Sequence, residues 1–433
     1  MTTPSAPDAG DPAERGPTQA PDQAAFYRQA RADQPGPLAG IRVLEATNYG
    51  AGPFCGMVLA DFGAESIKAE APAGDPIRLL SPFVDGVPGV ENSTWYLSIN
   101  RNKKGITLDL RRPKGQALFR RLAAQVDIVV ENYTPGVMAG WGLGYADLAA
   151  LKPDLIYVSV SGFGQFGPLS ARKGFDPVAQ AMSGLMSVTG EPDGRPLRAG
   201  FAFADDLSGW LGAMGAMAAL WHRSATGQGQ HVDSSLVDSL LYASDMGVMA
   251  AVNAGHVWQR QGAGAEGAAP LNSYRTRDGR YVFIHGVFDK AWVALCEVMQ
   301  RPDLVSDPRT VSVGARGQHA AVVDEVVAAY AARHTVEEIV AVAEQRGFVA
   351  APVLDFEQVA REPHFRERAS VTQVEHPLHG ALTLQGVSPK FSRTPACVRS
   401  PAPTLGQHNV DVYCGLLGLD AVALQTLQAD GII

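Results

Sequence analysis

Two adjacent carboxylates, Asp205 and Asp206, interrupt a long apolar stretch of mostly small residues between Arg198 and Trp221. An ionised carboxylate in apolar surroundings is costly unless it is hydrogen-bonded or takes part in a reaction. The sequence Asp-Asp-Leu-Ser also opens a helix-like run, and aspartate is a preferred N-cap residue. The pattern therefore leaves two interpretations open, a reactive carboxylate and a helix cap, and it does not assign either to one aspartate.

Other reactive residue types show no spacing that indicates catalysis or metal binding. His376 and His379 are the only close histidine pair, and Pro377 breaks the helical spacing that a metal site would use. No Gly-x-Ser-x-Gly motif is present. The scattered cysteines favour reduced thiols, a cytoplasmic protein and no metal site. They are Cys55, Cys296, Cys397 and Cys414.

The composition excludes several function classes. The chain has 433 residues, 46% of them hydrophobic, and a formal net charge of −8. This length suggests two or three domains, and the lack of a basic block argues against a nucleic-acid partner. The most apolar helical run, 207–221, is too short to span a bilayer, and the N-terminus does not resemble a signal peptide. We therefore expect a soluble protein without a membrane partner.

The first structured elements predict a nucleotide-binding type of fold. A short strand within 38–46 is followed by a turn with Gly50 and Gly52, a helix over 54–62 and a strand ending at Glu70. Only two of the three glycines of the dinucleotide fingerprint are present. The pattern therefore predicts a Rossmann-like fold without assigning NAD, and an NAD(P)-dependent oxidoreductase remains an alternative.

Strands and helices continue to alternate, which predicts an α/β fold with a parallel sheet covered on both faces. The expected strands are 104–109, 126–131 and 155–161, and the expected helices are 113–125, 136–141 and 145–152. The literal G-x-G-x-x-G at Gly162–Gly167 is followed by Pro168 and loop-like residues. We therefore interpret it as a glycine turn near a site, not as a phosphate-binding motif.

The chain divides into four segments. Residues 1–35 are rich in Pro, Ala, Gly and Asp, which predicts a disordered leader. Residues 36–254 form the first part of a large Rossmann-like domain, in which 235–254 is expected to be one helix. Residues 255–350 form a smaller α+β domain, and residues 351–433 return to the large domain.

The smaller domain includes, near its start, a glycine-rich loop at 261–269 that is expected to be a linker or a mobile lid. The sequence predicts a hairpin with the turn Asp278-Gly279, followed by a helix opened by the capping box of Thr335 and Glu338. Other expected helices cover 289–300 and 319–333. Residues 353–359, 371–376 and 380–385 are expected to be strands and short helices.

Several motifs, in their order and spacing, resemble the family III CoA-transferases, a family that also has an α-methylacyl-CoA racemase branch. The resemblance covers nearly the whole chain after the leader. The motifs are Gly40–Glu45, Gly52–Glu70, Gly74–Arg78, Asn100–Lys104, Glu131–Gly136, Ser161–Pro168, Gly174–Gly184 and Thr226–Gln230.

The resemblance implies a large domain built from both chain ends, a small domain, and a homodimer of two interlocked subunits. It implies a CoA-transferase that moves CoA from an acyl-CoA, with succinyl-CoA as the suggested donor, to a carboxylic acid, without a tightly bound cofactor. The flanking motifs place the family's catalytic aspartate at Asp205 and leave Asp206 as the N-cap. Asp205 would form an anhydride and then an aspartyl-CoA thioester, and a helix N-terminus would keep it ionised.

The resemblance also implies a set of CoA contacts, in which cations hold the phosphates. These contacts are Tyr49, Gly50, Ala51, Asn102, Lys103, Leu108, Arg111, Asn132, Tyr133 and Lys173. Ala71 and Gly140 replace basic residues of some relatives, so Arg78 or Lys104 is expected to compensate. Gly50 replaces a glutamine of the oxalate enzyme, which disfavours oxalate as substrate.

Alternatives within the resemblance depend on Phe175 and Asp176. The racemase branch has a histidine before this aspartate, and Phe175 cannot move a proton, which favours transfer over racemisation. Asp176 is a rival nucleophile, although Pro177 indicates a helix start. The loop Gly262–Gly267 is expected to exclude water from the site, although Ala and Glu266 interrupt its glycines. A CoA-binding protein without catalysis is a further alternative.

Overall fold

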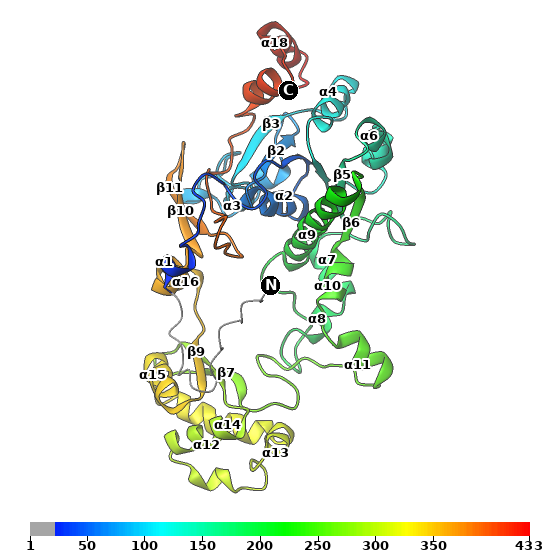
Figure 1. The fold of residues 1–433 in the computed structure, drawn as a ribbon. Coiled ribbons are helices and arrows are strands. Elements are labelled where there is room, and N and C mark those ends of the chain that lie inside the picture. Colours follow the sequence, from blue (N-terminus) through cyan, green and yellow to red (C-terminus); the bar gives the residue numbers. More distant parts are fainter. Residues whose placement is uncertain (1–21) are drawn as a thin grey trace, which may run out of the picture.

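A six-stranded parallel sheet forms the centre of the larger part of the molecule in this computed structural model, which describes residues 22–433 (Figure 1). The strand order is β3-β2-β1-β4-β5-β6, with all neighbours parallel. This is a doubly wound order, and it confirms the predicted α/β fold with a parallel sheet. The strands are β1 Arg42–Ala46, β2 Glu65–Glu70, β3 Lys103–Thr107, β4 Ile128–Glu131, β5 Ile156–Ser161 and β6 His231–Ser235.

Helices cover both faces of this sheet because parallel strands need crossover connections. Successive residues of β1 point to opposite faces, so Val43 belongs to one hydrophobic core and Leu44 to the other. The first core contains α2 (Ala51–Asp61) and α9 (Phe203–Thr226), and the second contains α4 (Pro113–Ala123) and α6 (Tyr145–Leu151).

Helices α2 and α9 approach each other closely because α9 carries glycines at the contact. A Cβ atom on Gly209 would lie 2.8 Å from the Ala51 carbonyl oxygen, and one on Gly212 would lie 3.3 Å from the Cys55 sulfur. This contact brings the N-terminal ends of the two helices together. It therefore positions the residues at those ends relative to each other.

The smaller part of the molecule has its own sheet and core. Strands β7 (Leu271–Arg275), β8 (Tyr281–His285) and β9 (Val349–Pro352) are antiparallel, and the third hydrophobic core lies between residues 269 and 350. The predicted hairpin is confirmed, with Gly279 at φ 79°, and both hydrogen bonds of the Thr335–Glu338 capping box are present. Its helices are α12 Asp289–Val298, α13 Val313–Gln318, α14 Ala320–Ala331 and α15 Val336–Arg346.

Two separate stretches of chain join the smaller part to the larger one (Figure 1). One leads from α11 (Gly247–Asn253) to β7, and the other leads from β9 to α16 (Phe356–Arg361). After α17 (Pro363–Glu367) come the strands β10 (Val371–His376) and β11 (Gly380–Gln385). These two strands pair antiparallel.

The C-terminal segment packs against the edge strand β3. The Tyr413 hydroxyl donates a hydrogen bond to the Thr107 carbonyl at 2.7 Å, and the Asp109 amide donates to the Ile432 carbonyl at 2.8 Å. This C-terminal segment contains two helical elements, η5 (Asp411–Leu416) and α18 (Ala421–Ala429). The segment covers an edge that would otherwise present unpaired backbone groups.

Two expectations differ from the structure. The described part of the expected leader, 22–35, contains the short helix α1 (Gln23–Phe26), and its Arg31 amide donates to the Arg393 carbonyl at 2.8 Å. The rest of the leader, 1–21, lies outside the described residues. The single helix expected over 235–254 is two helices, α10 (Leu236–Tyr242) and α11, because Asp245 between them has φ 54°.

The remaining elements are short. Among residues 22–433, no helix is both long enough and apolar enough to cross a membrane. The short elements are α3 Thr94–Ile99, α5 Val137–Gly140, α7 Asp176–Met182, α8 Leu185–Val188, η2 Pro76–Leu79, η3 Val84–Gly86 and η4 Pro302–Val305.

Candidate active site

The adjacent aspartates lie in the first turn of α9, not at its cap. The N-cap residue is Ala202, which supplies no side-chain cap, and Asp205 and Asp206 follow within the helix. The expectation that Asp206 caps the helix is therefore wrong. The buried backbone amide of Ala204, which has no acceptor within the helix, donates instead to Asp176 Oδ1 at 2.7 Å. A residue of another helix, α7, thus accepts the hydrogen bond from the N-terminal amide of α9 that a local aspartate was expected to accept.

Asp176 is occupied by structural hydrogen bonds. It begins α7, as predicted, and its Oδ2 accepts from the buried Gln180 side chain at 2.8 Å. The Gln180 Oε1 in turn accepts from the Ala199 amide at 2.8 Å. Asp176 therefore connects α7 to the segment that starts α9. Both of its oxygens accept hydrogen bonds, which disfavours the alternative that Asp176 is the nucleophile.

The carboxylate of Asp205 lies against Gly50, the N-cap residue of α2. A Cβ atom built on Gly50 would be 2.5 Å from Asp205 Oδ2, so a larger residue at position 50 would require the carboxylate to move. Within residues 22–433, the structure contains no hydrogen bond to either Asp205 side-chain oxygen. The carboxylate is thus available for chemistry, unlike that of Asp176.

Burial, followed by the nearby carboxylates of Asp176 and Asp206, raises the pKa of Asp205 to about 7. Burial and Asp176 raise the pKa of Asp206 to about 6. Desolvation and like charges thus oppose the ionisation that a helix N-terminus was expected to favour. A carboxyl group with a pKa near neutrality, next to a cavity, is typical of a functional site.

A cavity of about 570 Å³ opens beside the turn between β1 and α2, which carries Asn48 and Tyr49. Its wall includes residues that directly follow β1, β4 and β5, such as Asn48, Asn132 and Gly162. The sheet order reverses between β1 and β4, and doubly wound sheets bind ligands in the crevice outside the carboxyl ends of the strands at such a point. The cavity therefore lies where the fold predicts a ligand.

Most of the predicted CoA contacts line this cavity. Those in its wall are Tyr49, Leu108, Arg111, Asn132, Tyr133 and Lys173. Gly50 and Ala51 follow Tyr49 in the sequence, at the start of α2. These eight residues come from separate segments of the sequence, and the fold brings them to one end of the sheet.

Asn102 and Lys103 do not reach the cavity, which corrects the expectation that they contact CoA. Lys103 is fully buried, and its ammonium donates to Glu45 Oε2 at 2.9 Å and to the Pro53 carbonyl at 2.7 Å. The Asn102 side chain donates to Asp61 at 2.7 Å and accepts from backbone amides of the C-terminal segment. Both side chains are committed to internal contacts.

The two cations expected to compensate for missing basic residues are also paired. Arg78 is buried and binds Glu70 at 2.7 Å and Glu91 at 2.8 Å. Lys104 pairs with Glu65 at 2.7 Å. The cavity instead has Arg172 in its wall beside Lys173. The sequence analysis missed Arg172, although its position next to a predicted contact was a signal that could have found it.

Aromatic residues form another part of the cavity that the sequence analysis did not assign completely. Tyr133 and Trp141 meet edge to face with ring centroids 5.3 Å apart. Tyr49 and Phe175 form a similar pair at 6.1 Å. Trp141 and Phe175 were not among the predicted contacts. Trp141 is the C-cap residue of α5 and Phe175 is the N-cap residue of α7, and such a position alone gives no signal of a ligand.

The glycine-rich loop lies on the other side of the start of α9. It lines a second cavity, of about 670 Å³, together with residues of α8 and α11. Phe203, two positions before Asp205 in the sequence, is also in the wall of this cavity. The expected role of Gly262–Gly267 as a closing loop stays a prediction.

Comparisons with known proteins agree on one family. Residues 38–409 match the sequence model of CoA-transferase family III. The chain is 40% identical over 401 residues to succinyl-CoA–D-citramalate CoA-transferase of Chloroflexus aurantiacus, covering 92% of this chain and 98% of that protein. It is 34% identical over 412 residues to succinyl-CoA:glutarate CoA-transferase of Mus musculus, covering 94% and 92%.

A solved structure is similar in fold over most of the chain. The crystal structure of a CaiB/BaiF family protein from Brucella suis matches with a TM-score of 0.79 and 31% sequence identity. The match covers 88% of this chain and all of that one.

Proposed function

The chain belongs to CoA-transferase family III, and on that premise we propose that it moves CoA from an acyl-CoA to a carboxylic acid through a covalent intermediate on Asp205. The observation that carries the proposal is the placement of the Asp205 carboxylate. It has no hydrogen-bonding partner within residues 22–433, it lies against Gly50, and Gly50 directly follows Tyr49 in the wall of the cavity.

CoA occupies the cavity at the carboxyl end of the sheet. The volume of about 570 Å³ lies in the usual range for a ligand site. Arg111, Arg172 and Lys173 supply positive charge for the phosphates, and the side chain of Arg111 is 74% exposed beside its partner Asp109. Tyr133 and Trp141 offer aromatic surface for the adenine.

The reaction proceeds by successive acyl exchanges. The Asp205 carboxylate attacks the thioester carbonyl, CoA leaves as thiolate, and an anhydride between the donor acid and Asp205 forms. The thiolate then attacks the aspartyl carbonyl, which gives aspartyl-CoA thioester and releases the donor acid. The acceptor carboxylate attacks this thioester and releases the thiolate again. Attack of that thiolate on the acceptor carbonyl yields the new acyl-CoA and restores Asp205.

The proposed substrates are succinyl-CoA as donor and a short dicarboxylic acid as acceptor. Both relatives described above carry succinyl-CoA in their names, with citramalate or glutarate as the partner acid. Racemisation remains the alternative within the family. It is disfavoured because Phe175, which precedes Asp176, packs against Tyr49 and has no group that transfers a proton.

The experiment traps the intermediate. The protein is incubated with succinyl-CoA and then with hydroxylamine, and the modified residue is located by mass spectrometry. We expect a hydroxamate on Asp205, no adduct in Asp205→Asn, and an adduct still on residue 205 in the matched variant Asp206→Asn. A CoA-dependent adduct on another residue, or full exchange by Asp205→Asn, would refute the mechanism.

A second copy of the chain is the proposed partner of an exposed apolar surface on α9, α10 and α11. Trp221, Tyr242 and Val252 are 80%, 79% and 75% exposed, and large exposed apolar patches mark interaction sites. We propose a homodimer whose two subunits interlock, each built from the large and small domains expected from the sequence. The cytoplasmic location stays a prediction.

A further inference from the structure

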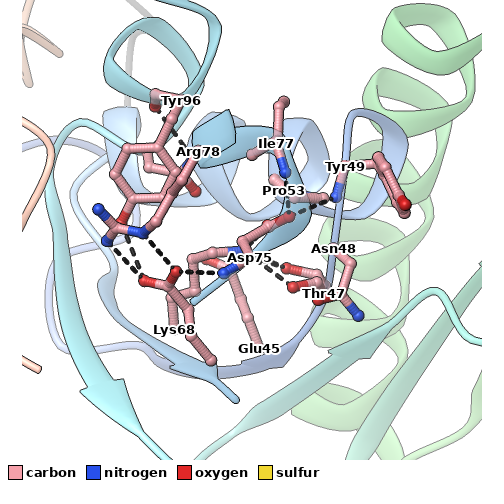
Figure 2. Close-up of polar contacts among 12 residues, drawn as sticks. Glu45, Thr47, Asn48, Tyr49, Pro53, Lys68, Asp75, Ile77, Arg78 and Tyr96 are labelled. Carbon is pink, nitrogen blue, oxygen red and sulfur yellow. Dashed lines mark hydrogen bonds and ion pairs between the residues drawn. The ribbon is translucent and has the colours of Figure 1, made fainter. Parts of the chain in front are cut away.

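A fully buried ion pair lies beneath the turn between β1 and α2. Lys68 and Asp75 have no more than 1% of their surface exposed, and Lys68 Nζ lies 2.9 Å from Asp75 Oδ2. Figure 2 shows the pair beside the turn that carries Asn48 and Tyr49. The reaction described above uses neither side chain.

Both members of the pair hydrogen-bond to the backbone of that turn (Figure 2). Asp75 Oδ1 accepts from the Tyr49 amide at 3.0 Å and from the Ile77 amide at 3.0 Å. Lys68 Nζ donates to the Thr47 carbonyl at 2.8 Å. The pair thus contacts the turn at two points, one on each side of Asn48.

The turn needs such support because its conformation is unfavourable. Tyr49 has φ 59°, in the left-handed region that residues other than glycine rarely adopt. A conformation of this kind persists only where the surroundings enforce it, and it occurs often at functional sites. The Asn132 side chain supports the turn from its other side, accepting from the Asn48 amide at 2.8 Å and donating to the Asn48 carbonyl at 2.7 Å.

The position of this turn determines how the cavity meets the reactive carboxylate. Tyr49 lines the cavity, and the next residue, Gly50, lies against Asp205. A small rotation at Tyr49 would move the cavity wall and the space for the carboxylate at the same time. Misplacement of reacting groups by about 1 Å can reduce a rate about a hundredfold.

We propose that Lys68 and Asp75 are positioning residues that hold the Tyr49–Gly50 turn and so align the bound thioester with Asp205. The effect on catalysis rests on the proposed function. The effect on the conformation of the turn does not depend on the proposed function. A buried ion pair is weak as a source of stability, because desolvation offsets its attraction. Its role here comes from its hydrogen bonds to the backbone of the turn, at Thr47 and Tyr49.

The opposite end of α2 provides a matched control. Arg101 and Asp61 form a second buried ion pair, with Nη2 and Oδ2 2.7 Å apart. Asp61 is the last residue of α2, and this pair contacts Asn102 instead of the turn. Loss of either pair removes a buried interaction of the same class, and only one of the two pairs contacts the turn.

The test compares two double variants that both remove the buried charges. In Lys68→Met/Asp75→Asn, the amide oxygen can still accept from the Tyr49 backbone. In Lys68→Met/Asp75→Leu, no acceptor remains. The control is Arg101→Met/Asp61→Leu. Each protein is assayed for urea unfolding, for kcat and KM of CoA exchange, and for hydrogen exchange of the peptide covering 47–56.

We expect the double variant with Asp75→Leu, compared with the one with Asp75→Asn, to lose protection at the Tyr49 amide and at least about tenfold in kcat. The control is expected to lose stability and to keep both the protection of the turn and a kcat within about threefold of the parent. Equal protection of the turn in the two double variants would overturn the proposal, whatever the activity. So would a kcat that follows stability alone across all three proteins.

The hydrogen-exchange readout separates this proposal from the proposed function. If the parent shows no CoA exchange and the turn still loses protection only in the double variant with Asp75→Leu, the reaction is wrong and the positioning role stands. If Asp205 is labelled normally in all three proteins at the parent rate, the positioning role is wrong and the nucleophile stands.

Discussion

At the scale of single residues, the three carboxylates of Asp176, Asp205 and Asp206 determine when the site can react. In the proposed reaction, Asp205 attacks the thioester as the ionised carboxylate. Its pKa of about 7 means that the reactive form gains population as pH rises through neutrality. Because the three groups interact, the midpoint of a pH profile belongs to the cluster and not to one residue.

We predict that kcat/KM rises with pH through about 7 and then levels off. In Asp206→Asn, one negative neighbour of Asp205 is lost, so ionisation becomes easier and the midpoint moves to lower pH. Rates measured from about pH 5 to about pH 9 test this. A midpoint that stays in place or moves upward would contradict the assignment. Asp176 is unsuitable for this test because it caps α9.

A second titration concerns stability. Glu131, at the end of β4, is buried, and burial raises its pKa to about 7 from the ordinary value of 4.5. Between these values, the folded state retains a proton that the unfolded state releases, so this group makes the protein less stable as pH rises. The effect is complete above the folded pKa and amounts to about 3 kcal/mol.

We therefore predict that Glu131→Gln stabilises the protein more at about pH 8 than at about pH 5. The amide oxygen of the new side chain can still accept from the Tyr133 amide, which now donates to Glu131 Oε2 at 2.9 Å. Urea unfolding of parent and variant at both pH values measures the difference. If the free energies of unfolding of parent and variant differed by the same amount at both pH values, Glu131 would be ionised in the folded protein at both.

The sequence led to Asp205 and to most of the cavity residues, but not to the roles of their neighbours. The spacing of flanking motifs places Asp205, and side chains that follow predicted strands reach the cavity. The cap of α9 comes from Asp176, 28 residues earlier, and the Lys103 ammonium is bound by Glu45, 58 residues earlier. Such partners are fixed by tertiary packing, so no local pattern reveals them.

At the scale of elements, the contact between α2 and α9 determines the position of Gly50 relative to Asp205. Most strands and helices of the large part were predicted from apolar runs to within a few residues, with 235–254, which is two helices, as an exception. The strand β9 was missed because four residues, Val349–Pro352, show no alternation. The glycines of α9 permit a close helix contact, but nothing in their spacing identifies α2 as the partner.

We predict that Gly209→Ala destabilises the protein by about 1–3 kcal/mol, because the new methyl group would meet the backbone of α2 at Ala51. It should also lower kcat, since α2 must shift and Gly50 moves with it. Gly314→Ala, in α13, is the control. Its methyl group meets no atom within 4 Å, and we expect a gain of about 0.5–1 kcal/mol from the reduced freedom of the unfolded chain. Urea unfolding and CoA exchange measure both effects.

At the scale of the whole molecule, the strand order and the return of the C-terminal segment decide where the site lies. Neither can be read from local patterns, because parallel neighbours are separated by crossovers and the Tyr413–Thr107 hydrogen bond spans 306 residues. The expectation of a returning segment came from the limited apolar content of residues 351–433, and the resemblance to a family agreed with it. The contacts of that segment with β3 supply the physical reason, which is the covering of a sheet edge.

The proposed interlocking of two subunits has a kinetic consequence that an ordinary dimer lacks. Subunits that pass through each other cannot separate without opening the chain, so dilution should not dissociate them and exchange should require unfolding. We predict that two differently tagged preparations, mixed under native conditions, form no mixed dimer over days, and that unfolding and refolding them together gives mixed dimers.

The control for this prediction weakens the surface contact without opening the chain. Trp221→Glu places a charge in the exposed apolar surface of α9, where burial of an unpaired charge is costly. An ordinary dimer with this substitution would dissociate or exchange faster. An interlocked one would stay dimeric at all dilutions and lose only stability towards urea. Mixed dimers forming in the native parent would exclude interlocking, and a monomeric parent would exclude the dimer itself.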